Sequence, residues 1–170
     1  HLNPTNICVV GCGFCAFAVW TEKDERAYAY SVDQLVDRAA QLSELGITEL
    51  HIVGGMTKEY DLPYYEELFS ELKAQLPHIS LTALTAVEVD FIARISKVSS
   101  AEALRRLREA GHDTMPGGGA EVFSPRVRKI IADRKVPAET WLEVHREAHA
   151  AGMRTNATLL FGHFETPEEQ

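Results

Sequence analysis

Cys8-Val9-Val10-Gly11-Cys12-Gly13-Phe14-Cys15 contains all three cysteines of this 170-residue sequence. Thiolates are metal ligands, but three of them make neither a complete set of disulfides nor the four-sulfur shell of a closed zinc site. Three ligands leave one coordination position open. An iron-sulfur cube held by three cysteines has one iron free to bind another molecule, and this is the chemistry that the segment predicts.

Two other interpretations of the cysteines stay open. A structural zinc ion would recruit a histidine such as His51 or His163, although closed zinc sites usually come as two cysteine pairs and the sequence has no second pair. Alternatively, the cysteines are ordinary buried residues, which would suit Cys8 in the apolar segment Ile7 to Val10. Three such residues within eight positions favour a metal site.

The composition is that of an ordinary globular protein. With 45% apolar residues, 170 residues are enough for one domain with a sizeable core. The formal net charge of -8 argues against nucleic acid as the main partner, because phosphate binding needs a positive field. One basic group is interpreted as a solvated helix face or as the entry path of an anionic substrate. It consists of Arg126, Arg128, Lys129, Arg134 and Lys135.

The sequence has no apolar run long enough to cross a bilayer, and its first residues lack the regions of a signal peptide. We therefore expect no membrane association. Unpaired cysteines spaced as cluster ligands belong in a reducing compartment, so the expected location is the cytoplasm. The start at His1 and the helix-opening pattern from Thr166 to Glu169 lead us to expect a fragment of a longer chain.

Apolar periodicity predicts alternating strands and helices. Five strands are expected, at about residues 6–10, 49–53, 79–86, 112–115 and 155–161. Helices are expected at about 31–45, 63–76, 89–95, 99–111, 125–132 and 137–151. This alternation implies parallel βα units with right-handed crossovers, so the expected fold class is α/β, either a barrel or an open doubly wound sheet.

Active sites on parallel βα folds collect in the loops after the carboxyl ends of the strands. Several polar or glycine-rich features occupy such positions, and we expect them at one mouth of the fold. They are the cysteine loop, Gly54-Gly55, Glu88, Gly117-Gly118-Gly119 with Glu121, and Gly162-His163-Phe164-Glu165. Asn156 and Thr158 share one face of the last expected strand by period-two alternation, and we expect them to line the interior.

The cysteine spacing of three and then two residues, with Phe14 before the last cysteine, resembles the cluster loop of the radical S-adenosylmethionine (SAM) enzymes. Longer segments resemble the branch of this family that contains the aminofutalosine synthases of the futalosine route to menaquinone. These segments are His1 to Cys8, Cys15 to Phe17, His51 to Gly55, Leu84 to Glu88, Met115 to Glu121 and Thr155 to Thr166. The sequence departs from the family pattern at Gly13, where Lys or Arg is usual, and at Thr57-Lys58, where His-Pro is usual.

The resemblance implies that residues 1–170 are a radical SAM core domain, covering roughly the first five βα units of a partial TIM-type barrel. It implies that Cys8, Cys12 and Cys15 ligate a 4Fe-4S cluster whose free iron chelates S-adenosyl-L-methionine. Residues implied to bind this cofactor are Gly54, Gly55, Glu121, Asn156 and Thr158. A tight turn at the glycine pair and a helix cap at Glu121 are the simpler alternatives.

Three titratable residues are candidates for catalysis, by substrate handling or proton transfer: Glu88, His163 and Glu165. A histidine changes charge near neutral pH, and a neighbouring carboxylate would orient it and raise its pKa. For His163 the simpler alternative is a hydrogen-bonded histidine at a strand end. No Arg or Lys is clearly placed for a substrate with two carboxylates, so the sequence predicts no residue for that role.

The resemblance implies addition of the 5'-deoxyadenosyl radical to the enol-ether double bond of 3-[(1-carboxyvinyl)oxy]benzoate, giving 6-amino-6-deoxyfutalosine. The implied partners are this small-molecule substrate and a reductant of the flavodoxin or ferredoxin type. Two related reactions stay open as alternatives, those of cyclic dehypoxanthine futalosine synthase and of the deazaflavin (FO) synthases. An alternative of another class is a non-catalytic zinc-binding domain.

Overall fold

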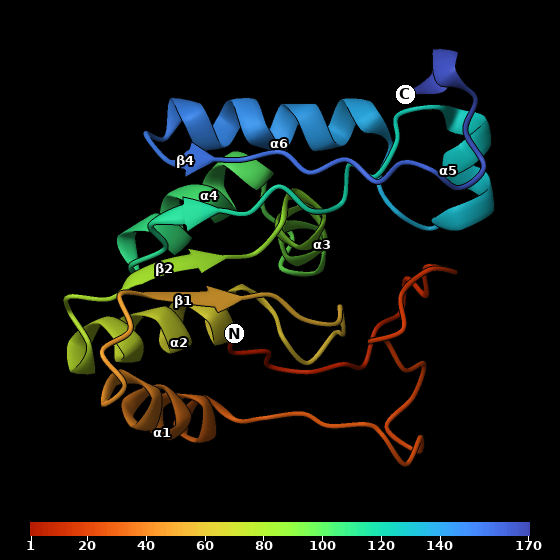
Figure 1. Cartoon of the computed structure of the whole chain (residues 1–170). Coiled ribbons are helices and arrows are strands. Elements are labelled where there is room, and N and C mark those ends of the chain that lie inside the picture. Colours follow the sequence, from red (N-terminus) through yellow and green to blue (C-terminus); the bar gives the residue numbers. More distant parts are fainter.

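The computed structural model describes residues 1–170 and contains one parallel sheet of four strands in the order β1-β2-β3-β4 (Figure 1). The strands are β1 (Glu49–Ile52), β2 (Ser80–Ala83), β3 (Thr114–Met115) and β4 (Arg154–Thr155). All neighbouring pairs are parallel. In Figure 1 the four arrows point toward the same side, where the cysteine segment and the last residues of the chain also lie. The expected α/β class is therefore confirmed.

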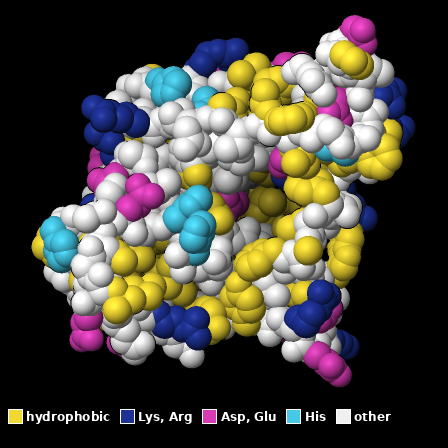
Figure 2. Space-filling model, in the orientation of Figure 1, with side chains coloured by type: hydrophobic (Ala, Val, Ile, Leu, Met, Phe, Trp, Pro, Cys, Tyr) yellow, Lys and Arg dark blue, Asp and Glu magenta, His cyan; other side chains and the backbone are white.

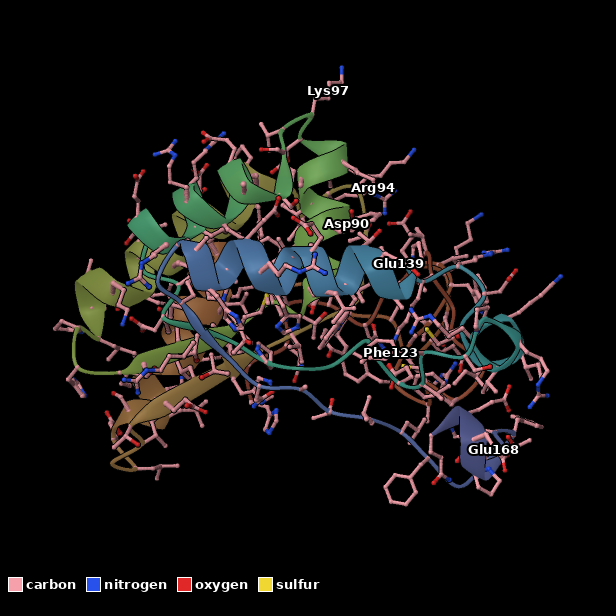
Figure 3. All side chains as sticks on the ribbon, turned by 90° about the horizontal axis from the view of Figure 1, so that it is seen from above. Asp90, Arg94, Lys97, Phe123, Glu139 and Glu168 are labelled. Atoms are coloured by element: carbon pink, nitrogen blue, oxygen red, sulfur yellow. The ribbon has the colours of Figure 1, made fainter.

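Six α-helices and one 3-10 helix accompany the sheet. They are α1 (Val32–Ser43), α2 (Leu62–Gln75), α3 (Ala86–Ile95), α4 (Ser100–Glu109), α5 (Pro125–Ile131), α6 (Ala138–Ala150) and η1 (Pro167–Glu169). Ser31 caps α1 and Thr85 caps α3, each with a reciprocal side-chain hydrogen bond from the third helical residue. Seen from above in Figure 3, the strands lie on one side of the molecule and α3 and α4 on the other.

The helices cover one face of the sheet, and the core lies between them. Leu50, Ile52, Leu81, Ala83 and Met115 point into this core and are at most 1% exposed. Because successive strand residues point to opposite faces, the residues between them lie on the face away from the helices. None of the helices is both long and apolar enough to span a membrane.

The first expected strand, Asn6 to Val10, is not a strand in the structure. The segment runs beside β1 and the loop after it, with hydrogen bonds from Leu2 N–H to His51 O and from Val9 N–H to Met56 O, both 2.9 Å. Its remaining pairings are isolated bridges to other segments, such as that between Ile7 and Val19. Because the partners change from residue to residue, no continuous ladder forms.

The range predicted for the last strand, 155–161, is longer than the strand in the structure. Only Arg154–Thr155 pairs with β3, because the opposite segment turns into Pro116 and the glycines that follow it. The strand predicted at 79–86 also ends early, since Thr85 and Glu88 form the capping box that starts α3 at Ala86 rather than at Val89. The sheet thus has four strands where five were expected, and the assignment of 1–170 to one domain stays a prediction.

Candidate functional site

The three cysteines line one cavity of about 260 Å³. Cys8 is buried and Cys12 and Cys15 are half-buried, and all three are free thiols. The other lining residues come from the same loop and from the return segment up to Trp20. In Figure 2 the surface is hollowed on the side of the cysteine loop and α5, and hydrophobic side chains gather around the hollow. All three cysteines thus face one cavity, and their role as cluster ligands stays a prediction.

The two histidines considered as a fourth zinc ligand do not line this cavity. The His51 ring lies against the His1 ring with centroids 4.7 Å apart, and the His163 ring is 3.0 Å from Leu160 O. No group of three or more His, Cys, Asp or Glu side chains is gathered around a single-ion site. Three soft thiol donors at one cavity suit a polynuclear iron-sulfur cluster, in which each sulfur binds a different iron.

A half-buried ion pair lies beside the cysteine loop. Lys135 pairs with Glu121, and both side chains are 12% exposed. The Lys135 ammonium also lies 5.1 Å from the centre of the Phe14 ring, at the distance of a cation–π contact. Burial raises the pKa of the Cys12 thiol, while the positive charge of Lys135 acts in the opposite direction. Lys135 therefore supplies positive charge where three thiolates would otherwise accumulate negative charge.

Both amide N–H groups of the glycine pair are used inside the chain. Gly54 N–H donates to Glu88 Oε1 at 2.8 Å, and Gly55 N–H donates to Thr5 O at 2.7 Å. A Cβ atom on Gly55 would lie 2.6 Å from the carbonyl carbon of Ile7, so the segment before the cysteines occupies the space of a side chain. This close approach of the backbone explains the glycine at position 55. Because both N–H groups are used, the glycine pair offers only its carbonyl oxygens, which could accept hydrogen bonds from a cofactor amino group.

Glu88 is 4% exposed, and its carboxylate is occupied by hydrogen bonds. Oε1 accepts from Gly54, and Oε2 accepts from the N–H and the hydroxyl of Thr85, both at 2.7 Å. Burial raises the pKa of Glu88, and the hydrogen bonds from Thr85 and Gly54 partly offset this rise. The residue thus joins the start of α3 to the glycine pair, a position that favours holding Gly54 in place over contacting substrate.

Asn156 and Thr158 both hold the first residue of the triple glycine. Asn156 Oδ1 accepts from Gly117 N–H at 2.5 Å, and the Thr158 hydroxyl donates to Gly117 O at 3.0 Å. The next carbonyl, Gly118 O, accepts from the indole N–H of Trp141 at 3.0 Å. The two residues therefore brace the glycine loop from the segment after β4.

Glu121 ends the glycine loop in a left-handed backbone conformation, with φ of 52°. Such a conformation is uncommon for a residue with a side chain and is held here by surrounding contacts. The carboxylate pairs with Lys135, and Glu121 O accepts from Leu160 N–H at 2.8 Å. Glu121 is not a helix cap, because α5 begins four residues later with Ser124 as its cap.

Two members of the basic group at 126–135 were wrongly interpreted as a solvated helix face. Arg128 is 7% exposed, and its guanidinium donates to backbone carbonyl oxygens on both sides of α5. They are Gly119 O at 3.4 Å and Val122 O at 3.3 Å, with Ala120 O and Val136 O. Lys135 is half-buried in its ion pair with Glu121. The spacing of charges in the sequence could not indicate that Arg128 and Lys135 are shielded from solvent, because their burial depends on loops that fold back onto α5.

His163 and Glu165 form a small self-contained turn. Glu165 accepts from the backbone N–H of Gly162 and, at 3.0 Å, of His163, and these bonds lower the pKa of Glu165 to about 2. His163 Nδ1 lies 2.9 Å from the Glu165 carboxylate. The hydrogen bonds of both side chains stay within residues 160–170. The predicted pairing of the two residues is present, whereas their catalytic role stays a prediction.

A parallel βα sheet with a three-cysteine loop at the carboxyl ends of its strands defines a class of enzymes. The family model described as the Radical SAM superfamily matches residues 2–170, and the chain belongs to this superfamily. The fold is also similar to the FeFe-hydrogenase maturase HydG from Carboxydothermus hydrogenoformans, with a TM-score of 0.68 and 21% identity, covering 95% of this chain and 35% of that one.

Individual relatives are more similar in sequence. The chain is 44% identical over 170 residues to aminodeoxyfutalosine synthase from Thermus thermophilus, covering 100% of this chain and 45% of the relative. It is 40% identical to cyclic dehypoxanthine futalosine synthase from Streptomyces coelicolor, with 100% and 43% covered. It is also 40% identical, with the same coverage, to 5-amino-6-(D-ribitylamino)uracil--L-tyrosine 4-hydroxyphenyl transferase 2 from Methanosarcina mazei. The chain spans less than half the length of these relatives.

Proposed function

We propose that the full-length protein is a radical SAM transferase of the aminodeoxyfutalosine synthase type. The observation that carries the proposal is the convergence of all three cysteines on one cavity, in a chain 44% identical to that enzyme from Thermus thermophilus. The substrate would be 3-[(1-carboxyvinyl)oxy]benzoate, and the product 6-amino-6-deoxyfutalosine.

Cys8, Cys12 and Cys15 would hold a 4Fe-4S cluster, and the carbonyl oxygens of Gly54 and Gly55 would accept from the amino group of SAM. Bound there, the two groups supply a 5'-deoxyadenosyl radical by one-electron cleavage of the sulfonium. The chain's own residues would position the loops around the cofactor site and shield that site from solvent. Lys135 and Glu121 hold the glycine loop against the cysteine loop, and Asn156 and Thr158 fix Gly117, so these residues support the cofactor site from two further segments.

The exposed hydrophobic side chains around the site suit the exclusion of water from a radical reaction. They include Phe14, Phe17 and Trp20 of the cysteine segment, and Leu160 and Phe161, which line a second hollow with Glu121. A radical adds to an alkene only if competing hydrogen donors and solvent stay away and the two partners are held close together. We propose Glu88, His163 and Glu165 for substrate handling or proton transfer as well, with Glu88 acting through its bonds to Gly54 and Thr85.

An anaerobic test of the full-length protein separates the candidate functions. We expect iron and sulfide in equal amounts, a cluster spectrum that changes on addition of SAM, and formation of the adenosylated product from 3-[(1-carboxyvinyl)oxy]benzoate. Colourless zinc-loaded protein would contradict the radical SAM chemistry. An intact cluster with no adenosylated product would contradict the substrate assignment alone.

The identities of 40% to two other radical SAM relatives favour a second candidate, a related reaction on the same scaffold. Cyclisation of dehypoxanthine futalosine and transfer of the tyrosine side chain to a ribitylaminouracil are the two reactions to assay beside the first. Each reaction needs an electron, for which we propose a donor of the flavodoxin or ferredoxin type. We propose the cytoplasm as the compartment, because free thiols and a reduced cluster need reducing conditions.

A further inference from the structure

A row of polar side chains crosses the face of the sheet that the helices leave open. His51 pairs in register with Thr82, Thr82 with Thr114, and Thr114 with Arg154. Their strand neighbours Leu50, Leu81, Met115 and Met153 point to the opposite side and are at most 3% exposed. Because side chains alternate along a strand, the four polar residues point away from the core. A sheet face that packs against other elements would carry apolar residues at these positions.

Arg154 differs from most other arginines of the chain, because no hydrogen bond or ion pair joins its guanidinium to another residue. Arg26, Arg94, Arg105, Arg106, Arg126 and Arg146 all pair with carboxylates. Arg154 lines a hollow of about 240 Å³ together with Thr82, Thr114 and Asn156. The two threonine hydroxyls lie 2.7 Å apart, so one donates to the other and one hydroxyl proton stays free. The hollow thus offers a guanidinium and a hydroxyl as donors.

The hollow lies beneath the loops of the cofactor site. Thr114 stands three residues before Gly117, and Thr82 three residues before Thr85. At roughly 3.3 Å per strand residue, the row is about 10 Å below the loops, which is the scale of one substituted aromatic ring. Glu49 lines the same hollow two residues further from the loops, where it pairs with Ser80. The side of the row nearer the loops therefore holds no acidic residue among those that line the hollow.

We propose that Arg154, with Thr82 and Thr114, binds the ring carboxylate of an aromatic substrate whose alkene faces the cofactor loops. The inference rests on the proposed function, since it assigns a residue to a substrate of that reaction. A planar guanidinium meets a carboxylate with two parallel hydrogen bonds, which fixes orientation as well as affinity. Holding the ring at its far end would leave the enol ether at the mouth, where the radical is generated.

The test is equilibrium binding to the anaerobic full-length protein loaded with SAM. Arg154→Met removes the donors and keeps the length, Arg154→Lys keeps the charge, and Arg105→Met on the exposed side of α4 is the matched control. For 3-[(1-carboxyvinyl)oxy]benzoate we expect a dissociation constant about tenfold to hundredfold higher with Arg154→Met, a smaller change with Arg154→Lys, and none with Arg105→Met. For 2-phenoxyacrylate, which lacks the ring carboxylate, wild type and Arg154→Met should bind equally.

Unchanged binding of the benzoate by Arg154→Met would overturn the inference, as would an equal loss for both ligands or a wild-type protein that binds neither. If the wild type forms the adenosylated product and Arg154→Met binds the benzoate normally, the proposed reaction is retained and the role of Arg154 is refuted. Conversely, Arg154-dependent binding of the benzoate without product would support the carboxylate subsite and remove the proposed reaction. Matching urea unfolding curves for the variants show that the fold is retained.

Discussion

Gly55 and Gly13 differ in the space that each has for a side chain. At Gly55 a Cβ atom would fall 2.6 Å from the Ile7 carbonyl carbon, whereas at Gly13 the nearest atom is Ile131 O at 3.8 Å. We predict that Gly55→Ala displaces the segment before the cysteines, lowers the free energy of unfolding by about 1–3 kcal/mol, and reduces the iron bound after anaerobic reconstitution. Gly13→Ala should change neither. Equal iron content in the two variants would contradict the close packing at Gly55.

Glu88 can be separated into a positioning and a chemical role by two substitutions. Glu88→Ala leaves Gly54 N–H and the Thr85 donors without their acceptor, so we predict a loss of roughly 2–4 kcal/mol in the free energy of unfolding. Glu88→Gln keeps one carbonyl oxygen and should lose less than half of that. If Glu88 acts through Gly54, Glu88→Gln raises the KM for SAM more than it lowers kcat. A fall in kcat alone, with a changed pH profile, would instead indicate proton transfer by Glu88.

At the scale of single elements, α5 depends on one buried arginine. This helix has seven residues, and Arg128 ties it to the glycine loop before it and to Val136 after it. We predict that Arg128→Met costs roughly 2–4 kcal/mol of unfolding free energy, because buried carbonyl oxygens lose a charged donor. The exposed neighbour Lys129→Met should stay within about 0.5 kcal/mol of wild type. Urea unfolding of both variants is the measurement, and equal midpoints would contradict the assigned role of Arg128.

Elements with local signals could be predicted from the sequence, and those that depend on distant partners could not. Ser31 and Ser99 mark helix starts by their own chemistry, and the structure has α1 and α4 beginning beside them. The strand predicted over 155–161 failed for a nonlocal reason. Its residues have the alternation of a strand, but after β3 the opposite segment is Pro116 and the glycine loop. Asn156 N–H and Thr158 N–H therefore donate to Met115 O and Gly117 O without extending the strand ladder.

At the scale of the whole molecule, the site joins parts of the chain that only the fold brings together. The sequence indicated the cysteines, the glycine pair and Glu121, because each follows an expected strand. The sequence did not indicate that Lys135 pairs with Glu121. It also did not indicate that the two amide N–H groups of the glycine pair donate to Glu88 and to Thr5 O. These contacts depend on how closely the cysteine segment and α5 approach the sheet edge, a distance that local patterns do not encode.

Acid should destabilise the whole fold through His112, which packs against Phe69 of α2 and is 1% exposed. Burial lowers its pKa from 6.5 to about 4, and its Nε2 is 2.7 Å from Ala83 O. Between these pH values the unfolded chain binds a proton that the folded chain does not, so stability falls as the pH drops from 6.5 toward 4. We predict that the loss of unfolding free energy between pH 7 and pH 5.5 is about 1 kcal/mol larger in wild type than in His112→Gln. His145, whose pKa burial also lowers to about 4, remains in both proteins and supplies an equal background. Urea unfolding at the two pH values measures the difference, and identical pH dependence would show that His112 is protonated in the folded state as readily as in the unfolded one.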